Sequence, residues 1–209
     1  NGNVPPAKKL WKSTFDKDIS RSIRYFMRMT IHGGYKVGQY WDNIPSHEWK
    51  GKCCDTHESM DHILTKCTAA GQKEIWDLTS EMWRMKTGIE MRPTIGQIMA
   101  GGVTKVGNMG ENRLYKILIT ESTHLIWKLR NERRIQHTGP HALEKIRNRW
   151  LKTINNRLVV DCAMTDGLKY GKKALKISLV KSTWKKTLKD ERTLAKDWPK
   201  KVGVLVGVG

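Results

Sequence analysis

Three of the four cysteines in this chain lie in one short segment that also holds two histidines. Cys53 and Cys54 are adjacent, His57 and His62 follow, and Cys67 ends the segment. Thiolate and imidazole groups are the ligands that zinc prefers in tetrahedral structural sites. The His-x4-Cys spacing from His62 to Cys67 is typical of zinc knuckles. The sequence therefore predicts a zinc site at Cys53, Cys54, His62 and Cys67.

The adjacent pair departs from the usual Cys-x2-Cys spacing, in which two intervening residues let both sulfurs face the metal. Side chains of neighbouring residues diverge, so we expect strain in the backbone if Cys53 and Cys54 bind one ion. His57, His47 or a water molecule is then an alternative fourth ligand. A metal-free segment whose cysteines pack as small apolar groups is a further alternative. In either case the clustering argues against a secreted disulfide framework.

The charge of the chain points to a polyanionic partner. Of its 209 residues, 39 are Lys or Arg and 20 are Asp or Glu, which gives a net charge of +19. Residues 53–139 are close to neutral at +2, whereas residues 140–209 hold seventeen basic and six acidic side chains, net +11. Such an excess argues against a neutral enzyme acting on a small molecule and favours nucleic acid.

The basic excess is concentrated in a stretch that contains eight lysines and no carboxylate. Lysine is a compact charge that neutralises phosphates without reading bases, and an exposed aromatic ring can stack on an unpaired base. The alternative is a solvated helix face. The predicted nucleic-acid contacts are Lys169, Lys172, Lys173, Lys176, Lys181, Lys185, Lys186 and Lys189, with Arg130, Arg133, Arg134, Arg147, Arg149 and Arg157 and the rings of Trp184 and Trp198.

Catalytic constellations are weak in this sequence. Glu121 and His124 are three residues apart and so share one face of a helix, where they could do acid–base chemistry in a hydrolase. One such pair supplies too few groups for a catalytic metal, and a role in helix packing is the preferred interpretation. Thr165-Asp166-Gly167 resembles an active-site tripeptide but lacks acidic partners, which favours a turn. We therefore expect no enzyme activity.

Apolar periodicity predicts a mainly α protein, a small helical bundle with few strands. Glycines and prolines mark the expected helix ends. The predicted helices cover residues 19–32, 59–66, 75–87, 93–100, 112–136, 146–158 and 172–188, followed by a Val/Gly tail that forms a short edge strand or is disordered.

Four segments follow from these patterns. They are an N-terminal helical segment (1–45), a knuckle-like Cys/His segment (46–70), a helical core (71–166) and a basic C-terminal extension (167–209). No apolar run approaches the roughly 20 residues of a membrane-spanning helix. Because the chain begins with Asn1 rather than Met, we expect a piece of a longer protein. We also expect it to be located inside the cell, in the nucleus or cytoplasm.

The Cys/His segment and its flanks resemble a known family. Glu58-Ser59-Met60-Asp61-His62-Ile63-Leu64, followed by Cys67, is similar to the zinc-binding region at the C-terminal end of fungal non-LTR (LINE-like) retroelement polyproteins. The resemblance covers most of the chain. It extends over parts of residues 19–45, 121–133, 148–150, 170–175 and 203–207, and to Trp198.

The resemblance implies a nucleic-acid-binding accessory region that follows a reverse transcriptase and RNase H and holds template RNA or target DNA near the polymerase. The paired carboxylates that these enzymes need for metal catalysis do not occur here. The main departure from the family pattern is Gly51, which stands where the first cysteine is expected. An inactive fragment left by a degenerate element is therefore the alternative.

Overall fold

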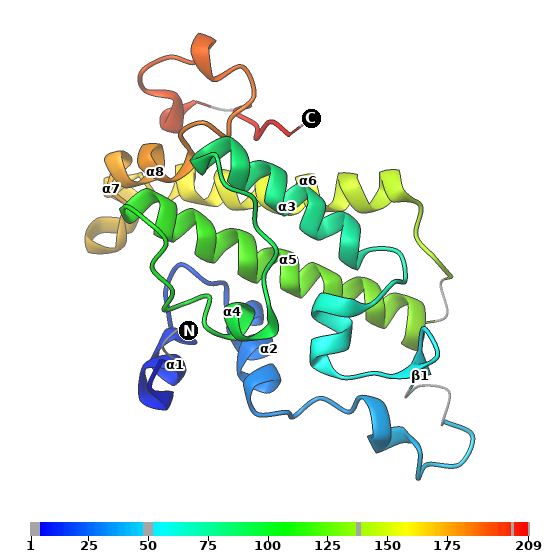
Figure 1. The fold of residues 1–209 in the computed structure, drawn as a ribbon. Helices are drawn as coiled ribbons and strands as arrows, with labels where there is room; N and C mark the ends of the chain where they lie inside the picture. Colours follow the sequence, from blue (N-terminus) through cyan, green and yellow to red (C-terminus); the bar gives the residue numbers. More distant parts are fainter. Residues whose placement is uncertain (1–4, 48–51, 137–138, 202, 209) are drawn as a thin grey trace.

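The predicted fold class is confirmed: the protein is mainly helical, with a Cys/His cluster near residues 53–67. The computed structural model describes residues 5–47, 52–136, 139–201 and 203–208. Among these, the strands β1 (Lys52–Cys53) and β2 (Thr56–His57) form one small antiparallel hairpin. Figure 1 shows the helices gathered around a long central helix.

That central helix is α5 (Met109–Ile135), 27 residues long. Its first turn is closed by a capping box, in which Asn108 accepts a hydrogen bond from the amide of Glu111 and Glu111 accepts one from the amide of Asn108. Four helices pack against it (Figure 1): α2 (Arg21–Ile31), α3 (Gln72–Thr87), α6 (Leu143–Ala163) and α8 (Ile177–Trp184). Shorter helices are α1 (Ala7–Ser13), α4 (Ile95–Met99) and α7 (Gly167–Tyr170).

Most of the helix ends follow from local sequence. α3 ends at Gly88, whose φ of 81° is left-handed and therefore favours glycine. α4 begins at Thr94, whose hydroxyl accepts a hydrogen bond from the amide of Gln97. The two short helices α1 and α7 have no counterpart among the predicted elements.

Buried residues from Ile19 to Val208 form one hydrophobic cluster, so all four segments contribute to the same core. A hydroxyl network crosses its centre. Ser122 of α5 lies 2.7 Å from the Thr79 hydroxyl of α3 and accepts a hydrogen bond of 2.9 Å from the indole of Trp150 on α6. Because each buried polar atom has a partner, this network fixes how the three helices meet.

The helix expected over residues 172–188 is wrong in its extent. Gly171 has a φ of 50°, and residues Gly171–Lys173 form a 3-10 turn that separates α7 from α8. α8 ends at Trp184, where Lys185 leaves the helical conformation with a ψ of 134°, and Lys186 follows with a φ of 69°. The tail does form a short edge: Val206 pairs with Leu188 in an antiparallel bridge. Among the described residues, no helix combines the length and apolar character needed to cross a membrane.

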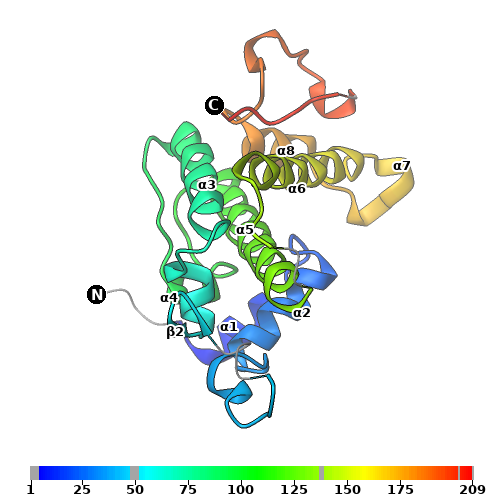
Figure 2. The ribbon, with the colours of Figure 1, turned by 90° about the vertical axis from the view of Figure 1, so that its right-hand side faces the viewer.

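The Cys/His segment and the C-terminal segment, which is the described chain after α8 (residues 185–201 and 203–208), lie at opposite ends of the molecule. The hairpin packs beside the last turns of α5, whereas the C-terminal segment packs on α6 and α8 at the other end (Figures 1 and 2). The two regions that the sequence singles out therefore do not share a surface.

Candidate metal centre and basic surface

A hairpin and a single helical turn bring the predicted metal ligands together. The turn of the hairpin is Cys54-Asp55, and both residues have positive φ, 54° and 56°. This is the backbone of a type I′ turn, which glycine and asparagine favour and cysteine does not. His62 and Cys67 flank the π-helical turn His62–Lys66, and the amide of Cys67 donates to the carbonyl of His62 at 2.8 Å.

The three sulfurs form a nearly equilateral triangle. The Sγ–Sγ distances are 3.7 Å for Cys53–Cys54 and 3.8 Å for both Cys53–Cys67 and Cys54–Cys67. A tetrahedral zinc with Zn–S bonds of about 2.3 Å places its sulfurs about 3.8 Å apart. The His62 ligand atom lies with the sulfurs in a group whose members are all within 4.8 Å of one another. The donor set therefore fits a tetrahedral ion.

The expectation that adjacent cysteines diverge needs correction. Both sulfurs turn to the same side because the left-handed conformation of Cys54 rotates its side chain relative to that of Cys53. The strain that we expected is thus located at Cys54 and Asp55. A second observation supports a bound cation: His62 Nε2 is buried without a hydrogen-bond partner, which is costly unless a ligand occupies it.

The thiols of the cluster differ in pKa, and therefore in how easily each becomes the thiolate that binds a cation. Burial acts to raise the pKa of Cys54, but hydrogen bonds from Thr68, whose hydroxyl lies 3.0 Å from the sulfur, lower it to about 6. For Cys67, burial and the neighbouring Cys53 and Cys54 raise the pKa to about 12. A bound cation would deprotonate such a thiol and offset the repulsion among the three sulfurs.

The alternative ligands lie elsewhere. His57 Nδ1 is 3.6 Å from a carboxylate oxygen of Asp42, and His47 Nδ1 is 3.1 Å from the carbonyl oxygen of Pro45. Neither belongs to the cluster of potential ligands. Gly51, the position of the missing cysteine, lies outside the described residues.

Arg130 anchors the Cys/His segment to α5 and is not a surface cation. It is 4% exposed, and its Nε lies 3.2 and 3.1 Å from the two carboxylate oxygens of Glu58, which is 3% exposed. The same segment is also linked to α3, because the indole of Trp76 donates a hydrogen bond of 2.7 Å to the Leu64 carbonyl. The prediction that Arg130 contacts nucleic acid is therefore wrong, because a buried charge with a fixed partner cannot reach a phosphate.

The lysine stretch is mostly at the surface. Seven of its eight lysines are exposed: Lys169, Lys172, Lys173, Lys176, Lys185, Lys186 and Lys189. Lys181 is half-buried, and its ammonium donates to the carbonyl of Lys196. These side chains extend from α7, the 3-10 turn, α8 and the segment that follows.

The two tryptophans predicted to stack on bases are buried, which corrects that expectation. Trp184 is 0% exposed and Trp198 is 8% exposed. The indole of Trp184 donates to Asp161 at 2.8 Å in the core. It lies on the side of α8 that faces α5 and α6, whereas Lys181 within α8 is half-buried and Lys176 and Lys185 at the two ends of the helix are exposed.

Other predicted arginine contacts are also engaged within the fold. Arg149 forms a two-pronged ion pair with Glu132 at 2.5 and 2.7 Å, and Arg157 lies 3.2 Å from Asp161. Arg133 donates to the Ala70 carbonyl at 3.1 Å and Arg147 to the Val208 carbonyl at 2.8 Å; Arg134 is half-buried. Arg133, Arg147 and Arg149 thus join separate segments of the chain and Arg157 pairs within α6, so we assign the candidate phosphate contacts to the lysines.

A buried ion pair at the lysine-bearing end was missed by the sequence interpretation. Asp161 of α6 is 0% exposed and accepts hydrogen bonds from Arg113 of α5 at 2.5 and 2.7 Å, in addition to that from Trp184. Arg113 also donates to Asp18 at 2.9 Å. Although burial opposes it, the charges of Arg113 and Lys116 lower the pKa of Asp18. The sequence feature that could have indicated this ion pair is Asp161 itself, a carboxylate three residues after Leu158 on an otherwise apolar helix face.

Glu121 and His124 are both half-buried on α5. Neither residue lines the pocket at the end of α6 or those beside Arg149, Cys67 and Tyr35. Burial raises the pKa of Glu121 to about 6, against the charges of Arg157 and Lys128. The His124 ring packs 5.3 Å from the ring of Phe26, as expected for a packing residue.

We predict that His124 stays neutral until the pH falls well below 6. Burial, and secondarily the charge of Lys128, lowers its pKa from 6.5 to about 4. The unfolded chain therefore takes up this proton first, and the stability contributed by neutral His124 is lost as the pH falls from about 6.5 to 4. The measurement is an NMR titration of the imidazole resonances, assigned with His124→Gln. A midpoint near 6.5 would show an exposed ring and contradict this.

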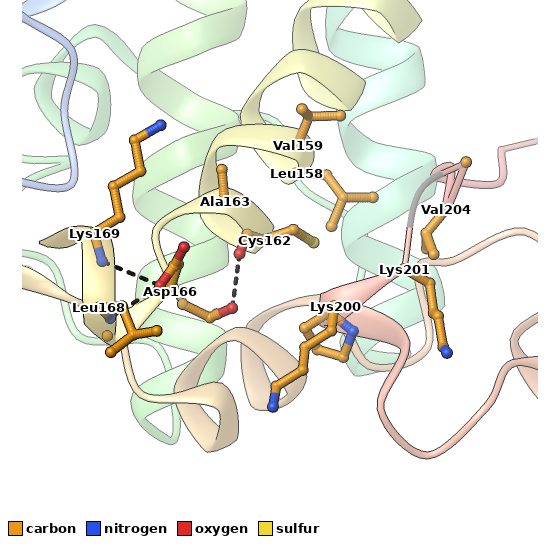
Figure 3. A pocket seen from close by; sticks show the side chains of 14 residues that line it. Leu158, Val159, Cys162, Ala163, Asp166, Leu168, Lys169, Lys200, Lys201 and Val204 are labelled. Carbon is orange, nitrogen blue, oxygen red and sulfur yellow. Dashed lines mark hydrogen bonds between the residues drawn. The ribbon is translucent and has the colours of Figure 1, made fainter.

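A pocket of about 780 Å³ lies between the end of α6, α7 and the C-terminal segment (Figure 3). Asp166 caps α7 there by accepting hydrogen bonds from the amides of Leu168 and Lys169, so Thr165-Asp166-Gly167 is a turn, as expected.

Comparison of the chain with protein-family models, curated proteins and solved structures finds no match. The functional argument therefore rests on the residues and their geometry.

Proposed function

We propose that this protein is a nucleic-acid-binding module that recognises the phosphate backbone through its C-terminal lysines and is stabilised by zinc at Cys53, Cys54, His62 and Cys67. The observation on which the proposal depends is the exposure of seven lysines within residues 169–189, a stretch without a single Asp or Glu. Binding of this kind is largely independent of sequence and is weakened by salt.

Two observations support different roles for the two regions, with zinc stabilising the fold and the lysines binding the strand. The candidate zinc ligands and the lysines lie at opposite ends of the molecule, so the ion would act on the fold and not on the bound strand. Ile63 and Leu64, between His62 and Cys67, are buried in the common core. Zinc would supply a cross-link that holds these two residues in place, because a structural site contributes folding energy directly.

The resemblance to fungal non-LTR retroelement polyproteins suggests the biological setting. In that setting the module follows a reverse transcriptase and RNase H in the same polyprotein and holds RNA or DNA near them. The degenerate-fragment alternative differs in a measurable way, since an inactive relic has no reason to retain salt-dependent binding. No observation favours the hydrolase alternative at Glu121 and His124.

The proposal predicts a specific change in the salt dependence of binding. Each phosphate contact contributes about −0.9 to the slope of log affinity against log salt on duplex DNA, and about −0.7 on single strands. Replacing Lys172, Lys173, Lys185 and Lys186 by Gln should therefore flatten that slope by about three to four units. The measurement is a fluorescence-anisotropy titration at several salt concentrations, on duplex DNA and on single-stranded RNA.

The matched control removes the same charge elsewhere. Lys8, Lys9, Lys12 and Lys105 are exposed and distant in sequence from the basic stretch. Their replacement by Gln should change the slope by less than about one unit, and neither variant should lose folding stability, because exposed charges contribute little to it. Equal slopes for the wild type and the first variant, or equal losses in the two variants, would contradict a localised phosphate-binding surface.

A further inference from the structure

The pocket at the C-terminal end of α6 is an open groove with an aliphatic floor. Val159, Cys162 and Ala163 of α6 lie on one side of it and Val204 on the other, with Leu168 of α7 at one end (Figure 3). Leu168 is 101% exposed and Val159 is 59% exposed. Side chains of this kind are normally withdrawn from water, and a contiguous exposed patch often marks a binding surface.

The rim of the groove is basic. Lys169 lies on the α7 side, and Lys200 and Lys201 lie on the side of the C-terminal segment; all three are exposed (Figure 3). Asp166, the one carboxylate among the described lining residues, is engaged in accepting hydrogen bonds from the amides of Leu168 and Lys169. An aliphatic floor between lysines on both sides is complementary to a ligand that is apolar along one face and negatively charged along its flanks.

The shape and chemistry favour a polypeptide over other occupants. No aromatic side chain lines the groove, so it lacks the flat platform on which an unpaired base stacks. A second copy of this chain would bring another net charge of +19 against the lysine rim and would be repelled. An amphipathic helix instead places Leu or Ile at i, i+3, i+4 and i+7 into such a groove and leaves its acidic residues beside the rim.

We propose that this groove docks an acidic amphipathic helix of a partner protein, with Val159 and Leu168 as apolar anchors and Lys169, Lys200 and Lys201 as the charged rim. This interaction shares Lys169 with the proposed nucleic-acid surface, but it differs from it in depending on the aliphatic floor. The groove thus gives the chain a second, protein-directed surface next to its basic stretch.

The test uses a fluorescent peptide of about 15 residues with Leu at i, i+3, i+4 and i+7 and Glu on its flanks. A peptide of the same composition in scrambled order controls for charge alone. The double variant Val159→Asn, Leu168→Asn keeps the charge of the protein and should weaken binding of the ordered peptide at least about ten-fold, since each anchor loses apolar burial. Leu143→Asn, on the same helix and 61% exposed but outside the groove, should leave binding unchanged.

Several results would overturn the proposal. They are a failure of the ordered peptide to bind, equal binding of the scrambled peptide, and an equal loss of binding in Leu143→Asn. A loss of single-stranded RNA affinity in the groove variant that matches its loss of peptide affinity would assign the groove to the nucleic-acid surface instead. Binding to vesicles of phosphatidylserine and phosphatidylcholine, lost in the same variant while the peptide does not bind, would assign it to a lipid surface.

Discussion

Replacing Asp161 by Ala is expected to lower the free energy of unfolding by about 3–5 kcal/mol. The carboxylate is 0% exposed, and removing it leaves the guanidinium of Arg113, which is 3% exposed, without its main partner. It also leaves the buried indole N–H of Trp184 without an acceptor. Urea denaturation followed by circular dichroism measures the change. Trp184→Phe, which removes one donor and keeps the ion pair, should cost less.

The control is an acidic residue in an exposed pair. Asp197 lies 3.5 Å from Lys201, with 56% of its side chain exposed. Asp197→Ala should change the free energy of unfolding by less than about 1 kcal/mol, because solvent screens such a pair. If Asp161→Ala were as mild as Asp197→Ala, the carboxylate would not be the buried partner of Arg113, and the packing of α5, α6 and α8 would need another explanation.

Removing zinc is expected to have the second large effect. A ligand present at about a thousand times its dissociation constant stabilises the folded state by about 4 kcal/mol. For a chain of this size, 1 kcal/mol corresponds to about 2–4 °C in melting temperature, so a chelator should lower it by about 8–16 °C. The measurement combines zinc content by mass spectrometry with thermal unfolding before and after chelation.

Single substitutions can distinguish the proposed zinc ligands from Cys162, the cysteine outside the cluster. Cys67→Ser and His62→Ala should each abolish stoichiometric zinc and reproduce the melting temperature of the chelated protein. Cys162, on α6, is half-buried and lies outside the cluster of potential ligands, so Cys162→Ser should retain one zinc per chain. Substoichiometric zinc after reconstitution, with a melting temperature that does not respond to chelation, would refute the metal site.

The Cys/His segment shows where spacing alone misled the interpretation. Adjacent cysteines were expected to diverge, because an extended or helical backbone points neighbouring side chains apart. The left-handed conformation of Cys54 and Asp55 reverses this, and a tight hairpin held against α5 by Glu58 and Arg130 maintains it. Conformations of this kind are disfavoured locally and depend on the surrounding structure.

In the lysine stretch, the exposure of most lysines agrees with the sequence prediction, whereas the predicted exposure of the tryptophan rings is wrong. Most lysines of the stretch are exposed, as their residue type predicts, although Lys86 on α3 is only 7% exposed and donates to the carbonyls of Ser182 and Lys185. Trp184 lies between the lysines of this stretch in the sequence, yet its side chain is buried. One side of α8 packs against α5 and α6, and the Trp184 indole N–H donates a hydrogen bond to Asp161 there. Residue type alone does not settle the burial of an amphipathic ring.

What the sequence determined by itself was therefore local: the helical class, the main helices and several of their capping residues, the identity of the four potential zinc ligands, and the concentration of positive charge after residue 140. These depend on periodicity, capping chemistry and solvation, which act within a few residues. The tertiary structure alone decided which charges are buried as pairs, as at Arg113–Asp161 and Arg130–Glu58, and where a groove opens between α6 and the C-terminal segment. Those outcomes depend on contacts between residues 40 to 100 positions apart, such as 48 for Arg113–Asp161 and 72 for Arg130–Glu58, and short-range patterns carry no information about them.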